Sequence, residues 1–332
     1  MTRPKIGISI GPQLPPSRIG EVAARIEESG VDEVWLAEDC FFAGGVAAAA
    51  AALAATDGVT VGLGILPAVA RNAAFTAMEL AALAEMYPGR VVAGLGHGMA
   101  AWMRQIGAAP RSPLTALDEH LHAIRDLLAG RTVTLAGDYV RLAQVGLDHP
   151  PAVVPPVLAG VRGPKSLGVA GLRADGVILA WPAAPAYVEQ ARSLVTSAWS
   201  AAGRSGRPLI VASSPVDIDT NLAGARARLR PQVAAELAMP SSRAHLEPLG
   251  LADDVAALRE KCGSPAEFAD RLPDEWIDEL TIVGDPDRCA AKIMRLQRAG
   301  ADSLVLALPA RLLDRRSGSF GDEVAAMLAA LP

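Results

Sequence analysis

The sequence is poor in cysteine and in aromatic residues, and each shortage excludes a class of protein. Its 332 residues include three cysteines, Cys40, Cys262 and Cys289, which lie far apart in the chain. That number and spacing fit neither a disulfide framework nor a thiolate zinc site, so we expect no metal centre. Aromatic residues make up 4% of the chain, whereas 51% of the residues are hydrophobic. The core must therefore consist mainly of Ala, Val and Leu, which allows helices to pack closely.

Long hydrophobic runs and clusters of basic residues are also missing. The longest apolar run, at 44–55, is short and rich in alanine, so we expect a buried helix and not a membrane span. The first residues, MTRPKIGISI, enter a strand at once and show no signal-peptide pattern, which predicts a cytoplasmic protein. A formal net charge of -5, with Lys and Arg scattered along the chain, argues against nucleic acid or an anionic membrane as a partner.

What the sequence does contain is a regular alternation of short β-branched runs and longer segments with helical spacing of apolar residues. Strands this apolar, without strict alternation, are typical of a parallel sheet that is buried on both faces. Eight such strands joined by helices close most economically as a (β/α)8 TIM barrel, with an open doubly wound sheet as the alternative. The predicted strands are Lys5–Ile10, Glu33–Ala37, Val59–Leu63, Val91–Leu95, Val157–Ala159, Gly176–Leu179, Leu209–Ala212 and Ser303–Leu308.

Two segments interrupt this alternation and are predicted to be insertions. Residues 131–142, RTVTLAGDYVRL, alternate apolar and polar residues around Ala-Gly-Asp, which indicates a β-hairpin. Residues 214–280 are mostly helical in pattern and follow the seventh strand, on the side where barrels keep their active sites. We find no linker, repeat or low-complexity segment, so we predict a single domain over residues 1–332.

The second predicted strand is followed by two carboxylates and a thiol. Glu38 and Asp39 are adjacent and point in different directions, so one of them can be desolvated and serve acid–base chemistry. The alternative is that Asp39 caps the next helix. Cys40 has no histidine near it in sequence, and a packed thiol is the simpler interpretation than an activated nucleophile.

The segment LAGVRGPKSLGVAG follows the fifth predicted strand and carries the most information. After Gly160 it places Gly163 and Pro164 at the start of a helix, followed by Lys165 and Ser166. Free amides at a helix N-terminus, with a lysine and a hydroxyl beside them, form a phosphate site. The same spacing also suits an ordinary strand-to-helix junction with Lys165 in solvent, and spacing alone does not separate the two.

A histidine and two tryptophans lie at other strand ends. In the run GLGHG, small residues would let a flat ligand lie against the strand end, and His97 is placed to donate or accept a proton. The alternative is a histidine that is hydrogen-bonded to a neighbouring loop. Trp102 and Trp181 follow the fourth and sixth strands, and we expect them to form pocket walls.

Taken in order, these segments resemble the luciferase-like monooxygenase superfamily, and within it the branch that uses the deazaflavin coenzyme F420. The resemblance rests on VWLAEDCFF, LGILPAVARNA, MYPGRVVAGLGHG, GRTVTLAGDYVRL, VPPVLAGVRGPKSLGVAGLRADGVIL and ELTIVGDPDRCAAKIMRLQRAGADSLVL. It spans nearly the whole chain. The sequence is similar to methylenetetrahydromethanopterin reductases and to F420-dependent glucose-6-phosphate dehydrogenases.

The resemblance implies a position for the cofactor. In this family the third strand ends in a bulge, often with a non-prolyl cis peptide, that backs the cofactor ring; here that bond would join Gly64 to Ile65. The segment at 160–166 would bind the cofactor phosphate, and Gly96–Gly98 would line the ring and its chain. The implied cofactor-binding residues are Gly64, Ile65, Gly96, His97, Gly98, Ala159, Gly160, Gly163, Pro164, Lys165 and Ser166.

The departures from the family pattern restrict the substrate. The sugar-phosphate dehydrogenases have Asp-His after the second strand, where this sequence has Asp39-Cys40, and a catalytic Glu where this sequence has Met99. We therefore reject a sugar phosphate and take His97 and Asp39 as the catalytic proton relay. The substrate pocket is predicted from Cys40, Met99, Trp102 and Trp181, which are mostly apolar, so we expect an apolar or flat small molecule.

Three functions are compatible with this pattern. The first is an F420-dependent oxidoreductase that transfers a hydride to or from C5 of the deazaflavin, with the protein supplying orientation and a proton. The second is an FMN-dependent monooxygenase on the same barrel, with Arg162 and Lys165 at the FMN phosphate. The third is a barrel that binds a cofactor without catalysis. Family members are commonly dimers, and we expect a homodimer.

Overall fold

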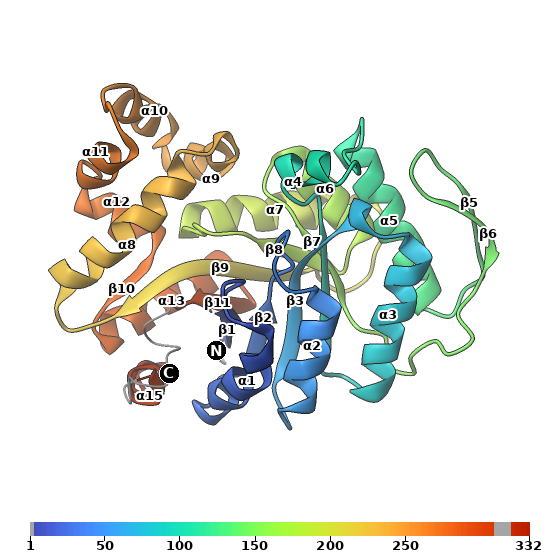
Figure 1. Ribbon diagram of the computed structural model, residues 1–332. Coiled ribbons are helices and arrows are strands. Elements are labelled where there is room, and N and C mark those ends of the chain that lie inside the picture. The colour runs from blue at the N-terminus through green and yellow to red at the C-terminus, as the bar shows by residue number, and fades with distance from the viewer. Residues whose placement is uncertain (1–2, 309–319) are drawn as a thin grey trace.

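The computed structural model describes residues 3–308 and 320–332, and its centre is a closed barrel of parallel strands (Figure 1). The strands run in the order β1, β2, β3, β4, β7, β8, β9 and β11, and β11 pairs with β1 to close the ring. The predicted (β/α)8 barrel is therefore confirmed, and the open sheet is excluded. The strands are β1 (Lys5–Ile10), β2 (Glu33–Leu36), β3 (Thr60–Pro67), β4 (Val91–Gly96), β7 (Val157–Gly160), β8 (Gly176–Leu179), β9 (Leu209–Ile218) and β11 (Ser303–Ala307).

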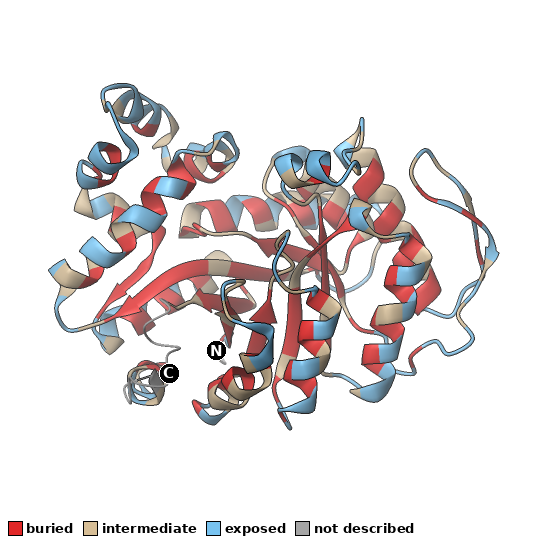
Figure 2. Cartoon of the chain, viewed as in Figure 1, coloured by how far each residue is buried: buried red, intermediate tan, exposed pale blue. Residues whose placement is uncertain are grey.

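Helices cover the outside of this barrel, and burial is concentrated in the strands and the inner helix faces (Figure 2). Two helix-to-strand connections use a left-handed glycine, Gly30 with φ 83° and Gly300 with φ 117°, which ends the helix. The covering helices are α1 (Ile19–Glu28), α2 (Gly45–Ala54), α3 (Ala73–Met86), α5 (Pro113–Leu128), α6 (Pro164–Arg173), α7 (Pro185–Ala201), α13 (Pro286–Ala299) and α15 (Phe320–Ala329). A short helix, α4 (Ala100–Gln105), follows β4.

One tryptophan fills the interior of the barrel. Trp35 of β2 is 3% exposed and belongs to an interior cluster with residues of β7, β8, β9 and β11. Its indole lies where side chains of neighbouring strands would otherwise be: a Cβ at Gly7 would be 2.7 Å from Cδ1, and one at Gly62 would be 2.4 Å from Cε3. The indole Nε1 donates to the buried carboxylate of Glu33 at 2.8 Å, which satisfies its polar atom.

The predicted hairpin is present, and its second strand extends beyond the predicted end. β5 (Val133–Ala136) pairs antiparallel with β6 (Arg141–Val145). Three hairpin amides, those of residues 138–140, donate to Glu119 of α5, so the hairpin is tied to the barrel's outer layer.

The insertion after the seventh barrel strand differs from the prediction at both ends. β9 runs on to Ile218 instead of ending at Ala212, and a further strand, β10 (Ile282–Gly284), pairs with this extension. The insertion has its own buried cluster, built around residues such as Leu229, Phe268 and Ile277. Its helices are α8 (Leu222–Leu237), α9 (Arg243–Leu246), α10 (Ala252–Glu260), α11 (Pro265–Asp270) and α12 (Asp274–Leu280).

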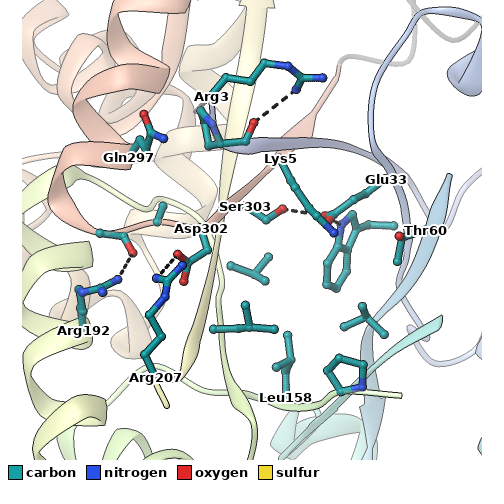
Figure 3. Close-up of a pocket in the computed structure, with 18 of the residues that line it drawn as sticks. Arg3, Lys5, Glu33, Thr60, Leu158, Arg192, Arg207, Gln297, Asp302 and Ser303 are labelled. Atoms are coloured by element: carbon teal, nitrogen blue, oxygen red, sulfur yellow. Dashed lines mark hydrogen bonds and ion pairs between the residues drawn. The ribbon is translucent and has the colours of Figure 1, made fainter. Parts of the chain in front are cut away.

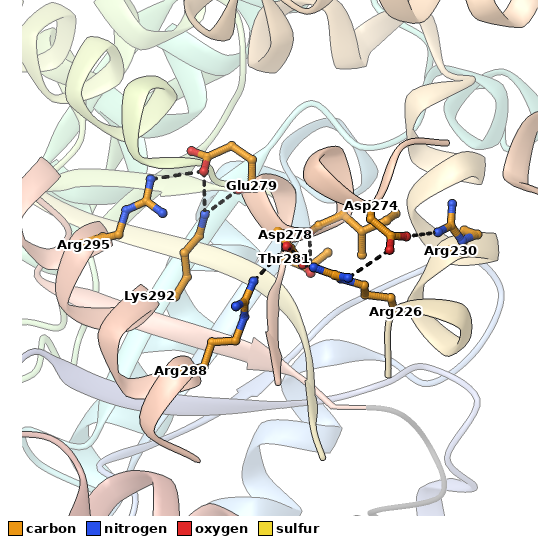
Figure 4. A network of polar contacts seen from close by, with 10 residues as sticks. Arg226, Arg230, Asp274, Asp278, Glu279, Thr281, Arg288, Lys292 and Arg295 are labelled. Atoms are coloured by element: carbon orange, nitrogen blue, oxygen red, sulfur yellow. Dashed lines mark hydrogen bonds and ion pairs between the residues drawn. The ribbon is translucent and has the colours of Figure 1, made fainter. Parts of the chain in front are cut away.

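A network of ion pairs joins the insertion to the barrel helix α13 (Figure 4). Arg226 of α8 contacts Asp278 of α12 through Nε at 2.9 Å, and Arg288 of α13 reaches the same carboxylate at 2.8 Å. Lys292 donates to the carbonyl of Glu279 at 2.6 Å, and burial lowers the pKa of this lysine to about 8. Because α8, α12 and α13 share these carboxylates, the insertion is held against the barrel by charge as well as by apolar packing.

None of the helices in the described part of the chain is long and apolar enough to span a membrane. All three cysteines carry free thiols.

Two glycines with different surroundings predict opposite effects of substitution by alanine, since Gly62 faces the Trp35 indole and Gly168 faces open space. Gly62→Ala would place a methyl group inside the indole, and we expect it to lower the free energy of unfolding by about 1–3 kcal/mol. Gly168→Ala, within α6 where a Cβ would meet nothing within 4 Å, should raise it by about 0.5–1 kcal/mol. Thermal unfolding of both variants checks this, and equal midpoints would show that the indole is not confined as described.

Candidate active site

The predicted site residues lie at the carboxyl ends of neighbouring strands, and the bulge in β3 is at their centre. The register between β3 and β4 shifts between Leu63 and Leu66, which marks the bulge that the resemblance implied. The peptide bond between Gly64 and Ile65 is cis, as the resemblance implied. The bond between Cys40 and Phe41 is also cis, and no feature of the sequence analysis indicated it.

The bulge directs the side chain of Ile65 at two glycines of adjacent strands. A Cβ at Gly160 would lie 2.3 Å from Cγ2 of Ile65, and one at Gly96 would lie 3.0 Å from its Cδ1. These two glycines pair with each other in the β4–β7 register. The resemblance implied that Gly96 lines the cofactor ring and that Gly160 belongs to the phosphate segment, and in the structure both glycines also make room for Ile65.

An ion pair that the sequence analysis did not identify holds the bulge in place. Arg71, just beyond β3, bonds both carboxylate oxygens of Glu38 at 2.5 Å, and this hydrogen bonding raises the pKa of Arg71. The amide of Glu38 donates to the carbonyl of Ile65 at 3.4 Å, so the pair is attached directly to the bulge. Asn72 accepts from the amide of Ala74 at 2.9 Å and caps α3. Opposite charges after two adjacent strands were the sequence pattern that would have predicted this pair.

The structure separates the roles of the two adjacent carboxylates. Glu38, and not Asp39, bonds the start of the next helix, because its Oε2 accepts from the amide of Gly45 at 2.7 Å. Asp39 is half-buried, and burial raises its pKa. Burial, with the charges of Glu38 and Asp39, raises the pKa of the neighbouring Cys40 thiol, which agrees with a packed thiol and not a thiolate nucleophile.

His97 contacts the segment that the sequence analysis assigned to phosphate. Its Nε2 lies 3.1 Å from Oγ of Ser166, which joins the end of β4 to the first turn of α6. Burial lowers the pKa of His97, so the ring is neutral at pH 7. The His97 ring thus contacts Ser166, and the raised pKa of Asp39 comes from burial and not from a contact with His97.

The N-terminus of α6 is open to a ligand. Its cap residue, Gly163, has no side chain to bond the first amides, and a Cβ there would meet nothing within 4 Å. Pro164 and Lys165 are exposed, and Ser166 is half-buried. The preceding strand, β7, ends at Gly160, one residue beyond the predicted end, and its buried Ala159 is paired with Leu95 of β4. Amides without a side-chain cap, an exposed lysine and a half-buried hydroxyl thus occupy the first turn of the helix for which a phosphate site was one of two interpretations.

Exposed apolar side chains surround this edge of the barrel. Phe41 is 67% exposed and Met99 is 46% exposed, and both follow strands that end at the site. Trp102 of α4 and Trp181, after β8, are half-buried. Large apolar side chains in solvent favour a site that an apolar or aromatic ligand covers.

A buried histidine joins this edge to the insertion. His245 of α9 is fully buried, and its Nδ1 lies 2.9 Å from the carbonyl of Pro182. Its ring stacks on Tyr187 with centroids 4.2 Å apart, and Tyr187 donates to the carbonyl of Arg162 at 2.9 Å. The side chain of Arg162 is bonded to Glu236 of α8. Arg162 is thus directed at the insertion and not at the N-terminus of α6.

Two cavities lie at the other end of the barrel. The larger has a volume of about 820 Å³ and is lined at the amino-terminal ends of the strands. Active sites of such barrels form at the carboxyl ends, so this cavity is separate from the candidate active site. In the described residues no group of three or more His, Cys, Asp or Glu side chains is arranged to hold a metal ion.

Comparisons with known proteins agree with the fold. A family model for luciferase-like monooxygenases matches residues 1–303. The chain is 31% identical to the 5,10-methylenetetrahydromethanopterin reductase of Methanolobus tindarius, over 91% of this chain and 94% of that protein. It is 29% identical to the F420-dependent glucose-6-phosphate dehydrogenase of Nakamurella multipartita, over 96% of this chain and 94% of that protein. The structure of the coenzyme F420 dependent tetrahydromethanopterin reductase from Methanopyrus kandleri matches with a TM-score of 0.82 at 22% identity, over 99% of each chain.

The buried His245 predicts that stability falls in mild acid. Burial lowers the pKa of His245 to about 4, whereas an unfolded histidine has a pKa of about 6.5. Above pH 6.5 both states are neutral and the contribution is complete. As the pH falls below 6.5, His245 is protonated in the unfolded state but stays neutral in the folded state. The free energy of unfolding has therefore decreased by about 3 kcal/mol once the pH is below 4.

The measurement is the thermal midpoint between pH 7 and pH 4.5. His245→Phe keeps a ring on Tyr187 and should flatten the pH dependence, whereas His149→Asn, at an exposed position, should leave it unchanged. Equal slopes in all three proteins would show that His245 does not cause the acid sensitivity.

Proposed function

This chain belongs to the luciferase-like monooxygenase family, and we propose that within it the protein is an F420-dependent oxidoreductase. The reaction is transfer of a hydride between C5 of the deazaflavin and an apolar or flat small molecule. The proposal is carried by one observation, the convergence of the Ile65 bulge, His97 and the uncapped start of α6 at one edge of the barrel. The choice of F420 as the cofactor rests on the names of the relatives.

The residues at this edge fit the cofactor. The phosphate of F420 is a diester with a single negative charge, which the amides of α6 and one lysine, Lys165, can balance. Open space above Gly163 admits the phosphate, and the bulge at Gly64 and Ile65 supplies an apolar backing for a ring. When bound, the cofactor accepts or supplies the hydride.

The chain's own residues then orient the reactants and move a proton. We assign Asp39 as the proton donor when the substrate is reduced, because burial raises its pKa and favours the protonated acid. Asp39 would pass its proton to the substrate heteroatom whose bonded, electrophilic carbon receives the hydride. Glu38 and Arg71 hold the bulge in position, and neutral His97 fixes Ser166 beside the phosphate.

FMN is the alternative cofactor, and the pairing of Arg162 argues against it. The terminal phosphate of FMN is a monoester with close to two charges at neutral pH. The two cations that the sequence offered for it were Arg162 and Lys165, but Arg162 is bonded to Glu236 and Ser241 of the insertion. One lysine remains, which suits the singly charged diester better. A non-catalytic cofactor-binding barrel is the third possibility, and the desolvated Asp39 argues against it.

Titration of the purified protein with F420 and, separately, with FMN tests the cofactor. Quenching of tryptophan fluorescence should report binding, since Trp102 and Trp181 border the site. We expect F420 to bind at least about tenfold more tightly than FMN, a difference of about 1.4 kcal/mol. Lys165→Ala should weaken F420 binding about tenfold because it removes a charge-assisted contact.

Lys261→Ala is the matched control, because Lys261 is exposed on the insertion. Tighter binding of FMN would assign the protein to oxygen-using monooxygenases. If neither cofactor bound, the phosphate-site assignment at residues 160–166 would be wrong.

Asp39→Asn tests the proton donor once a panel of apolar and flat alcohols, ketones and imines has identified a substrate. We expect kcat to fall about 100-fold with KM little changed, because proton transfer is lost and binding is not. In the wild type, substrate reduction should slow as the pH rises through the raised pKa of Asp39, and the reverse reaction should slow as the pH falls through it. Asp39→Asn should lose both dependences, and Asp138→Asn, on the exposed hairpin, should keep them. An unchanged pH profile in Asp39→Asn would assign the proton to another group.

A further inference from the structure

The amino-terminal mouth of the barrel contains a cavity that the proposed reaction does not use (Figure 3). Its volume of about 820 Å³ is within the range of about 300–1,000 Å³ that small-molecule sites occupy. It lies between the starts of the barrel strands and the end of α13, at the opposite end of the strands from the Ile65 bulge.

The inner wall of this cavity is apolar. Trp35, Leu158 and Val211 are at most 4% exposed and close its inner end, and the half-buried Val92, Pro156 and Leu209 supply the apolar surface that lines it. The polar atom of the indole is already bonded to Glu33, and Ser303 donates to the same carboxylate at 2.6 Å. What remains for a ligand at this depth is therefore apolar surface.

The rim carries several basic side chains, and Lys5 and Arg298 are the two that we expect to reach a bound anion. Arg207 is paired with Asp302 at 2.5 Å, and Arg192 donates to the carbonyl of Gly300 at 2.8 Å. Lys5, by contrast, is 62% exposed and lies 3.9 Å from Glu33, a long contact for an ion pair. Arg298 is exposed at the end of α13 and also lines the cavity. The basic side chains at this mouth are Arg3, Lys5, Arg192, Arg207 and Arg298, against the acidic Glu33, Glu189 and Asp302.

We propose that this mouth is a second binding site, for a small amphipathic anion that places an apolar body against Val92, Pro156 and Leu209 and directs its charge toward the basic rim that includes Lys5 and Arg298. An apolar floor beneath a cationic rim selects a molecule with both properties: a neutral hydrocarbon leaves the cations without a partner, and a small inorganic anion leaves the floor in water. The site is independent of the F420 assignment, because it shares no residue with the carboxyl-end site.

Isothermal titration calorimetry of the full chain with 2-naphthoate tests the proposal, with the uncharged 2-naphthalenemethanol as the paired probe. We expect one naphthoate per chain and at least about tenfold weaker binding of the alcohol. The double variant Lys5→Gln/Arg298→Gln should weaken naphthoate binding about tenfold, and Val92→Phe, which fills the cavity, should weaken it further. Arg141→Gln, on the exposed hairpin strand β6, is the matched control and should bind as the wild type does.

Three results would overturn the proposal: no naphthoate binding, equal binding by the wild type and Lys5→Gln/Arg298→Gln, or displacement of naphthoate by saturating F420. Displacement would place the probe at the carboxyl-end site. Both substituted residues are exposed, so the double variant should fold, and the single variant Arg298→Gln repeats the test should it not. If the protein binds no F420, the naphthoate result with these variants still decides this proposal.

Discussion

The limited width of the barrel interior is the constraint on which this structure depends. Two large side chains, Trp35 and Ile65, occupy successive levels of the interior, and each fits because neighbouring strands carry glycine there. Close-packed interiors tolerate little added volume, so these glycines are set by their neighbours and not by turns. The same arrangement brings the bulge of β3 to the carboxyl end of the barrel, where the cofactor is proposed to lie.

The site depends on a second contact, which acts across loops. Glu38 bonds three groups: the guanidinium of Arg71, the amide of Gly45 and, through its own amide, the carbonyl of Ile65. A half-buried carboxylate with this many partners fixes the ends of β2 and β3 relative to each other. Asp39, next in the chain, is desolvated, and this environment is the reason for proposing it as the proton donor.

Much of the fold could be predicted from the sequence, because each barrel strand is a short apolar run bounded by helical spacing. The extension of β9 could not, since Ser213, Ser214 and Pro215 interrupt the apolar pattern and are held in the strand by pairing with β11. The strand β10 exists only through its pairing with that extension. At the candidate site, the sequence pattern indicated Asp39 as a possible helix cap and Arg162 as a possible contact of an FMN phosphate. The structure gives helix bonding to Glu38 and directs Arg162 to Glu236, because both choices depend on which loops meet in space.

The confinement of Trp35 has a consequence for how such sequences can diverge. Gly7 and Gly62 lie on the two strands that flank β2, and a side chain at either position would clash with the same indole. A smaller residue at position 35 would release both positions at once, whereas a side chain at either one requires position 35 to shrink first. The three positions should therefore vary together among related barrels, and the order of substitution should be constrained: the tryptophan is lost before the glycines are.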